Sequence, residues 1–270
     1  MRKVLHITDV HFGRDHQSDR SAGIIELSLA RRPDVVVFSG DLTKRAKPSQ
    51  FAQARHFVDA LGAPAIVVPG NHDVPLFRVW ERVFSPFGAY RRHFDPQLEP
   101  IFEDDELLIV GINTAHAWTF TGGRIWRRRL QEVECCLAAD AGRRFAIVVQ
   151  HHQMIPVPGY GSEEVFRNAR AAARALERGG ADLVLSGHVH LSYLGDSTAI
   201  DDQAERAIPV LFSGTASSTR GRGPEKDRNT CHWLEIDRDE VLVDRLEWRR
   251  EHGGFKTAES CVLSRNPRSS

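Results

Sequence analysis

Cysteine is scarce in this sequence. The 270 residues include only four cysteines: Cys135 and Cys136 are adjacent, Cys231 and Cys261 lie far downstream, and no pair has CxxC spacing. This spacing argues against a disulfide framework and a thiolate zinc site, and it favours a reduced, cytoplasmic protein. The first residues, "MRKVLHITDVH", hold an apolar run that is interrupted by a histidine and an aspartate. They predict neither a secretory signal nor a membrane span.

An excess of charge of one sign is also missing. Lys plus Arg and Asp plus Glu both number 36, so the formal net charge is zero. A neutral chain offers no long-range field for a polyanion, and we therefore expect no stable complex with nucleic acid. Internal repeats and coiled-coil heptads are lacking too, which argues against a solenoid or a fibrous protein. The oligomeric state stays open.

Length and composition favour one globular unit. With 270 residues, of which 41% are hydrophobic, the chain can bury one large α/β core. We expect a single domain over residues 1–264. A disordered tail, "RNPRSS", is expected to follow it at residues 265–270.

The sequence does have a regular alternation of two kinds of segment. Short β-branched runs alternate with segments of helical period, such as 49–61 and 163–178. The alternation predicts parallel or mixed sheets with crossover helices. Five of the runs stop directly before a cluster of aspartate, asparagine or histidine: "KVLHIT", "DVVVFS", "PAIVV", "FAIVVQ" and "ADLVLS". The clusters are therefore predicted at strand carboxyl ends, where open α/β sheets build their sites.

These five clusters contain the donor groups of a divalent metal site. Carboxylate, imidazole and amide groups without cysteine suit manganese, iron or zinc. In extended backbone, residues i and i+2 project to one side, so two of the clusters each predict a pair of ligands that face one region. The clusters are "TDVH" with Asp9 and His11, "SGDLT" with Asp41, "PGNHD" with Asn71, His72 and Asp73, "QHHQ" with His151 and His152, and "SGHVH" with His188 and His190.

An ordinary structural role is the competing interpretation. A single D-x-H or H-H pair is more often a surface or core feature than a ligand. Five clusters at five strand ends would, without a ligand, leave buried polar groups unsatisfied, at about 1–3 kcal/mol for each group. Two metal ions would remove that cost. Gly40, Gly70 and Gly187 precede the clusters and permit the sharp turns and close backbone approach that such a site needs.

The ordered clusters resemble the calcineurin-like metallophosphoesterases, whose blocks are D-x-H, G-D, G-N-H-[DE], H and G-H-x-H. All five blocks occur here in that order. The resemblance implies an α/β fold, a four-layer αββα sandwich with two mixed β-sheets, and two divalent metal ions (manganese, iron or zinc) along one edge. It also implies the ligands: Asp9, His11 and His190 for one ion, Asn71, His151 and His188 for the other, and Asp41 as the bridge between them.

The same resemblance implies the reaction. His72 lies just outside the metals and acts on the substrate, where a protonated imidazole can serve as general acid, and Asp73 is placed to orient it. His152 follows the ligand His151, although the two histidines can exchange roles. The implied activity is hydrolysis of a small phosphodiester, nucleotide or glycerol-based, by in-line attack of a metal-bridging hydroxide. The blocks are most similar to those of the cyclic-nucleotide and glycerophosphodiester phosphodiesterases.

Other functions remain open at this point. A phosphomonoesterase or a nucleotide-lipid pyrophosphatase is compatible with the same ligands, although the related lipid A precursor hydrolases typically carry arginine at the position of His72. An apolar groove lined by Phe77, Trp80 and Phe84 would favour the lipid substrate. The neutral charge argues against a DNA nuclease. The intact ligand set argues against a non-catalytic scaffold.

Two segments between the clusters are candidates for substrate contact. Residues 74–94 are rich in aromatics and arginine and can build a platform for a base or a slot for an acyl chain. We favour instead a helix face that packs its aromatic side chains on the core. In residues 111–130, Asn113 and His116 follow a strand and face the same rim as the ligands.

The last third of the chain carries weaker signals. Residues 213–230 predict a mobile loop that lies close enough to the site to act as a lid. The stretches "CHWLEID" and "EVLVDRLEW" alternate apolar with polar residues, and they predict antiparallel strands of a second sheet. His232 in the first of them is expected to be an ordinary strand residue.

Overall fold

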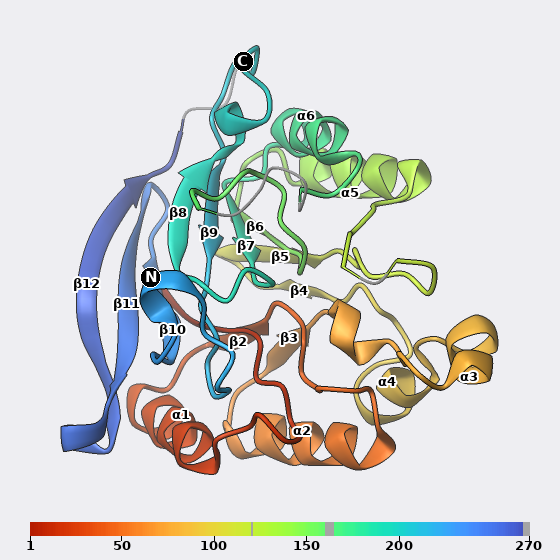
Figure 1. Cartoon of the computed structure of the whole chain (residues 1–270). Coiled ribbons are helices and arrows are strands. Elements are labelled where there is room, and N and C mark those ends of the chain that lie inside the picture. Colours follow the sequence, from red (N-terminus) through yellow and green to blue (C-terminus); the bar gives the residue numbers. More distant parts are fainter. Residues whose placement is uncertain (120, 160–164, 267–270) are drawn as a thin grey trace.

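The computed structural model describes residues 1–119, 121–159 and 165–266. Two layers of strands lie between two layers of helices (Figure 1). In chain order the strands and α-helices are β1 (Arg2–Ile7), α1 (Ser18–Arg31), β2 (Val35–Phe38), α2 (Pro48–Ala60), β3 (Ala65–Val67), α3 (Val79–Phe84), α4 (Gly88–His93), β4 (Ile101–Glu103), β5 (Leu107–Gly111), α5 (Arg127–Asp140), β6 (Phe145–Val149), α6 (Ala169–Gly179), β7 (Leu183–Ser186), β8 (Tyr193–Asp196), β9 (Pro209–Phe212), β10 (Thr230–Ile236), β11 (Glu240–Arg249) and β12 (Gly254–Ser264).

Both sheets are mixed. The first has the order β12-β11-β10-β1-β2-β3, in which β1, β2 and β3 are parallel and β10, β11 and β12 are antiparallel. The second has the order β4-β5-β6-β7-β9-β8, with four parallel strands between antiparallel edge strands. Every residue of β2, "VVVF", is buried, as expected for a central strand that is covered on both faces. The predicted αββα fold with two mixed sheets is confirmed.

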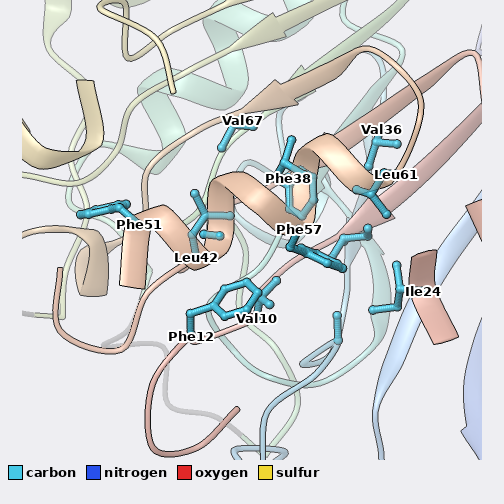
Figure 2. Packing of buried hydrophobic residues seen from close by; sticks show 14 of the residues in the cluster. Val10, Phe12, Ile24, Val36, Phe38, Leu42, Phe51, Phe57, Leu61 and Val67 are labelled. Carbon is cyan, nitrogen blue, oxygen red and sulfur yellow. The ribbon is translucent and has the colours of Figure 1, made fainter. Parts of the chain in front are cut away.

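Helices α1 and α2 cover the outer face of the first sheet. The buried positions of α2 and its end recur with helical period, at Phe51, Ala54, Phe57, Val58 and Leu61, so the helix presents one apolar face to the strands. Figure 2 shows α2 lying across β2, and the ring centroids of Phe57 and Phe38 are 6.0 Å apart. The helix thereby holds the carboxyl ends of β1 and β2 in place.

A second layer of contacts joins the two sheets to each other. One buried cluster combines residues of the first sheet, such as Val4 and Val37, with residues of the second, such as Ile109 and Ile147. Another cluster lies between the second sheet and helices α5 and α6. Because the sheets share a core, the arrangement supports our proposal that residues 1–264 form one domain.

Strands β10 and β11 pair antiparallel as predicted, but they do not belong to a second sheet, so that part of the prediction is wrong. Strand β10 pairs antiparallel with β1, with Leu5 opposite Trp233, and therefore extends the first sheet. Alternation of apolar and polar residues identifies a strand, but it does not say which free edge the strand will join. His232 is buried in β10, and its ring stacks 6.0 Å from that of His6.

The two predicted helices have different outcomes. The segment 49–61 corresponds to α2, within one residue at each end. The segment 163–178 corresponds to α6, which begins only at Ala169; residues 163 and 164 lie outside the described residues, and 165–168 are not helical. Asn168 Nδ2 donates to Ile125 O at 2.6 Å, and its Oδ1 accepts from Ile125 N at 3.1 Å. This pairing with a neighbouring loop holds the residue before the helix out of helical geometry.

The expected disordered tail is ordered at its first two residues. Arg265 pairs with Asp182 at 2.9 Å, and Asn266 Nδ2 donates to Ala207 O at 2.6 Å. The other four residues of that prediction, 267–270, lie outside the described part of the chain. Within the described residues, no helix has the length and apolar character needed to cross a membrane.

The loop 213–230 is anchored over its first part instead of standing free. Thr215 Oγ1 donates to Asp9 O at 2.7 Å, and Ala216 N donates to Thr8 O at 3.1 Å. Residues 215–218 are all buried. A loop rich in glycine and serine predicts exposure, but these bonds tie it to the end of β1.

Candidate metal centre

The polar clusters come together where the two sheets meet at their strand carboxyl ends. Strands β1, β2 and β3 of the first sheet and β6 and β7 of the second each end directly before one of them. Four of the side chains offer ligand atoms within 4.8 Å of one another, and we call these four residues the first cluster: Asp9, His11, Asp41 and His190.

The backbone of the ligands differs from our prediction. We expected extended backbone for the two pairs, but φ is 53° at Asp9, 51° at His11, 73° at His188 and 57° at His190, and Asp41 has the same conformation with φ at 54°. In the described residues, these are five of the eight non-glycine positions with positive φ. L-residues avoid this left-handed region, which costs of order 1 kcal/mol or more at each position. Left-handed turns, and not extended strands, therefore direct these side chains into the site.

The first cluster holds nitrogen and oxygen atoms close around one point. Asp9 Oδ1 lies 2.9 Å from His190 Nε2 and 3.4 Å from His11 Nε2, and Asp41 Oδ2 lies 3.7 Å from His11 Nε2. The other oxygen of Asp9 is fixed, because it accepts from His188 N at 3.0 Å and from the Thr8 hydroxyl at 2.8 Å. Only Oδ1 of Asp9 is thus directed toward the imidazoles.

A second cluster adjoins the first and shares Asp41 with it. We define it by Asp41, Asn71, His151 and His188. His151 Nε2 lies 3.4 Å from Asp41 Oδ1 and 3.2 Å from Asn71 Oδ1, and the rings of His151 and His188 have centroids 5.1 Å apart. His151 Nδ1 donates to Ser39 O at 2.7 Å, which turns Nε2 toward the cluster.

The donor atoms of the first cluster suit a bound cation better than they suit one another. Asp9 Oδ1 is buried and has no hydrogen-bond partner of proper geometry. Burial lowers the pKa of His11 to about 3, so this ring is neutral at physiological pH. His190 Nδ1 donates to Arg220 O at 2.7 Å, which in the neutral ring leaves a lone pair on Nε2. Carboxylate oxygen and imidazole lone pairs directed at one point are the donor set of a divalent metal ion.

The second cluster contains a proton that a metal ion would replace. Burial acts to lower the pKa of His151, but the charges of Asp41 and Asp9 and the hydrogen bonds outweigh it and raise the pKa to about 9. Without metal, the ring therefore carries a proton at neutral pH. A metal ligand must give up this proton, so we expect metal binding at this cluster to release it.

The turn glycines make room for these side chains. A Cβ atom at position 187 would lie 2.1 Å from Thr8 Oγ1 and 2.7 Å from Asp9 Oδ2. We expect Gly187→Ala to displace Asp9 and lower metal affinity about 10–100-fold, the usual effect of disturbing a ligand's partners. Metal titration followed by elemental analysis measures this. Gly122→Ala is the control, because a Cβ there meets nothing within 4 Å. Equal metal affinities in the two variants would contradict the packing argument.

His72 lies beside the clusters, and its ring is oriented by a backbone carbonyl. His72 Nδ1 is 3.0 Å from Lys44 O, and its ring packs edge-on against His11, with centroids 5.0 Å apart. Burial lowers the pKa of His72, and Arg220 acts in the same direction while Asp41 opposes it. A proton on Nε2, which an acid needs, therefore requires additional negative charge near the ring.

Asp73 joins two of the predicted turns. Its carboxylate accepts hydrogen bonds from Leu42 N at 3.1 Å, Thr43 N at 2.9 Å and Gly70 N at 3.0 Å. Burial and the charge of Asp41 raise the pKa of Asp73 to about 7, whereas these donors favour its ionised form. The Asp73 carboxylate therefore holds the turn that carries His72, while Lys44 O bonds directly to the His72 ring. That Asp73 orients His72 stays a prediction.

The remaining candidate residues have local partners. His152 Nδ1 lies 2.7 Å from Thr114 Oγ1, which holds this ring beside the second cluster. The arrangement supports His151 as the ligand of the pair. Asn113 Oδ1 accepts from Ala115 N at 2.9 Å, and His116 Nε2 lies 2.5 Å from Arg124 O, so these two side chains stabilise their own loop.

Three aromatic side chains of the segment 74–94 are exposed, so the favoured core interpretation is wrong for them. Phe77, Trp80 and Phe84 are 76%, 77% and 75% exposed, whereas Phe87 and Tyr90 are buried. Trp80 and Phe84 lie on one side of α3 and stack on each other with centroids 5.9 Å apart. The ring of Phe77 is 5.3 Å from the guanidinium of Arg45, the residue that follows Lys44 in the chain.

Sequence reasoning missed three charged residues at the centre. Arg220 Nη1 lies 3.0 Å from His72 Nε2 and 3.1 Å from His11 Nε2. Asp15 pairs with Lys44 and lies 3.9 Å from Arg220 Nε. None of the three belongs to a motif or to a periodic pattern, so only the folded loops bring them to the site.

Comparison with known proteins confirms the resemblance seen in the sequence. Residues 2–192 match the family model of the calcineurin-like phosphoesterases, and the chain belongs to this family. It is 35% identical over 256 residues to a probable cyclic nucleotide phosphodiesterase of Synechococcus, covering 87% of this chain and 93% of that protein. It is 31% identical over 172 residues to a glycerophosphodiester phosphodiesterase of Enterobacter lignolyticus, covering 57% of this chain and 58% of that one.

A solved structure shares the fold. A dimetal phosphatase from Danio rerio superposes with a TM-score of 0.69 at 12% sequence identity, covering 98% of this chain and 99% of that chain. At this level of identity the likeness concerns the fold alone. The cluster of aspartates and histidines at strand ends is thus found in a fold that also occurs in a dimetal phosphatase.

Proposed function

We propose that the protein is a phosphodiesterase that depends on two divalent metal ions and hydrolyses a small phosphodiester, either a nucleotide or a glycerol-based ester. Asp9, His11 and His190 would hold one ion, and Asp41 would contribute to both. The second ion would be held by Asn71, His151 and His188. The observation that carries the proposal is the buried Asp9 Oδ1, which has no proper hydrogen-bond partner although two imidazole nitrogens lie within 3.4 Å.

The chain's own residues contribute positioning and proton transfer. When bound, two divalent ions would supply Lewis acidity and a nucleophile that forms near neutral pH. The Lys44 carbonyl orients the ring of His72 so that Nε2 points toward the first cluster. Nε2 is the atom that would give a proton to the leaving alkoxide. Ser39 O and Arg220 O hold the rings of His151 and His190 in the orientation that ligands need.

The relatives support a diester substrate, because two of them are named as phosphodiesterases of a cyclic nucleotide and of a glycerophosphodiester. The choice between these esters, and among manganese, iron and zinc, belongs to experiment. We also propose a cytoplasmic location and no stable complex with nucleic acid. All four cysteines are free thiols, which supports a reducing compartment.

Turnover after metal reconstitution tests the proposal. The protein is stripped with a chelator, reloaded with manganese, zinc or iron, and assayed on bis-p-nitrophenyl phosphate, p-nitrophenyl phosphate, cyclic AMP and a glycerophosphodiester. We expect metal-dependent turnover with at least a tenfold preference in kcat/KM for the diesters, a difference of about 1.4 kcal/mol in transition-state binding. Preference for the monoester would replace the proposal with a phosphatase. No turnover with both ions bound would rule out all of these substrates.

A further inference from the structure

Arg220 brings a permanent positive charge to the centre. It lies in a loop that contains none of the sequence motifs. Its Nη1 lies 3.1 Å from His11 Nε2 and 3.0 Å from His72 Nε2, so it stands between a metal ligand and the residue that we propose as proton donor. The Arg220 side chain is 23% exposed, so solvent and small molecules reach it. A guanidinium in this place faces whatever binds between His11 and His72.

The backbone of Arg220 is locked to the metal centre. Arg220 O accepts from His190 Nδ1 at 2.7 Å, and the next residue but one, Arg222, donates from its N to His190 O at 3.2 Å. On the other side, Thr219 N donates to Asp15 O at 2.9 Å. These bonds fix the position of the Arg220 Cα, and only the side chain is left to move.

The guanidinium shares its nearby carboxylate with a second cation. Asp15 lies 3.9 Å from Nε of Arg220, and the same carboxylate also pairs with Lys44. The carboxylates of Asp9 and Asp41 face His11, where the proposed metal ions would use them. With these ions bound, an anionic ligand beside His72 would be favoured, and arginine presents a planar pair of donors that matches phosphoryl oxygens.

Arg220 also places its charge against a residue of the first cluster. Nη1 of Arg220 lies 3.1 Å from His11 Nε2 and 3.3 Å from His11 Nδ1, so it stands against the ring and leaves the Nε2 lone pair to the proposed ion. A divalent ion on His11 would repel this guanidinium. Because the backbone of Arg220 is fixed, its side chain would turn away from His11 when the ion binds, toward the substrate side. There it would meet the phosphoryl group next to His72.

We infer that Arg220 binds a non-bridging phosphoryl oxygen of the substrate and so acts as a phosphate clamp that complements the two metal ions. The inference rests on the proposed function for the identity of the substrate. It predicts two opposite effects of removing the guanidinium, because phosphate loses a donor while the first metal ion loses a nearby positive charge that repels it.

Binding measurements on Arg220→Gln and Arg220→Lys test the inference. Calorimetric titration of the metal-loaded protein with inorganic phosphate is expected to show about 10–100-fold weaker binding in Arg220→Gln. We expect a smaller loss of phosphate affinity in Arg220→Lys, which keeps the charge but lacks the planar pair of N–H donors. Titration of the metal-stripped protein with Mn²⁺ is expected to show equal or tighter binding in Arg220→Gln. The control is Arg228→Gln, in the same loop, whose side chain pairs with Glu247.

Two results would overturn the inference. If Arg220→Gln binds phosphate with an affinity within twofold of the wild type, Arg220 does not bind the phosphoryl group. If that variant loses a metal ion, Arg220 supports the metal site instead. The test is separate from that of the proposed function. If the wild type binds phosphate through Arg220 but hydrolyses no diester, the phosphate-binding role of Arg220 stands and the proposed phosphodiesterase activity is wrong.

Discussion

Asp41→Asn is expected to abolish turnover and to release at least one of two bound metal ions. The two oxygens of Asp41 face different clusters, with Oδ2 3.7 Å from His11 Nε2 and Oδ1 3.4 Å from His151 Nε2. Asparagine offers one oxygen and no charge, so it cannot serve both. We expect kcat to fall on the order of 10³-fold or more, since several kcal/mol of charge stabilisation are lost. Elemental analysis of the purified variant, together with kcat on a diester, measures both effects.

The control for Asp41→Asn is a second buried carboxylate outside the metal centre. Asp182 is buried directly before β7 and accepts from Ala146 N at 2.9 Å, and its ion pair with Arg265 measures 2.9 Å. Asp182→Asn should lower the melting temperature but leave two ions bound. If Asp41→Asn also kept two ions per chain, Asp41 would not be a bridge, and the two clusters would have to be separate sites.

Much of the fold could be predicted because the signals are local. The five apolar runs that precede polar clusters became β1, β2, β3, β6 and β7. A parallel strand buried on both faces reads as an unbroken β-branched run, and a cluster directly after it must lie at the site edge of the sheet. That reasoning correctly brought Asp9 and His190 together, although they are 181 residues apart in the chain (190 minus 9).

The parts that could not be predicted depend on long-range packing. Spacing placed Asp9 and His11 on one side of an extended strand, but both are left-handed, because the turn is held from outside through bonds such as Thr215 Oγ1 to Asp9 O at 2.7 Å. Helical period suggested that Trp80 would face the core, yet α3 is six residues long and its aromatics are exposed. Arg220 lies in a stretch of serine, glycine and arginine that has no pattern at all.

The left-handed ligands and the tightly packed glycines indicate that the centre is held at an energetic cost. Five strained residues and a buried carboxylate oxygen without a partner each act against folding. The large apolar cores on both sides of the sheets offset this cost. Bound metal ions would reduce it further, so chelation is expected to destabilise the protein.

His72→Ala is expected to separate substrates by their leaving groups. Nitrophenolate leaves without much need of a proton, whereas an alkoxide requires one, so an acid at position 72 matters mainly for alkyl esters. We expect kcat to fall about 10²–10⁴-fold on a glycerophosphodiester or cyclic AMP, and tenfold or less on bis-p-nitrophenyl phosphate. Steady-state kinetics of the metal-loaded variant measures both. His252→Ala, at an exposed position in the turn after β11, is the control.

The pH dependence of the same variant distinguishes an acid from a residue that only binds. A general acid works when protonated, so its contribution is present below its pKa and is lost as the pH rises through it. Burial lowers the pKa of His72, and Arg220 adds to this effect. The ratio of wild-type to His72→Ala activity on an alkyl diester should therefore be largest at acidic pH and shrink toward neutrality. A ratio independent of pH, or equal losses on alkyl and aryl esters, would show that His72 positions the substrate without donating a proton, and the donor would then have to be sought elsewhere around the leaving group.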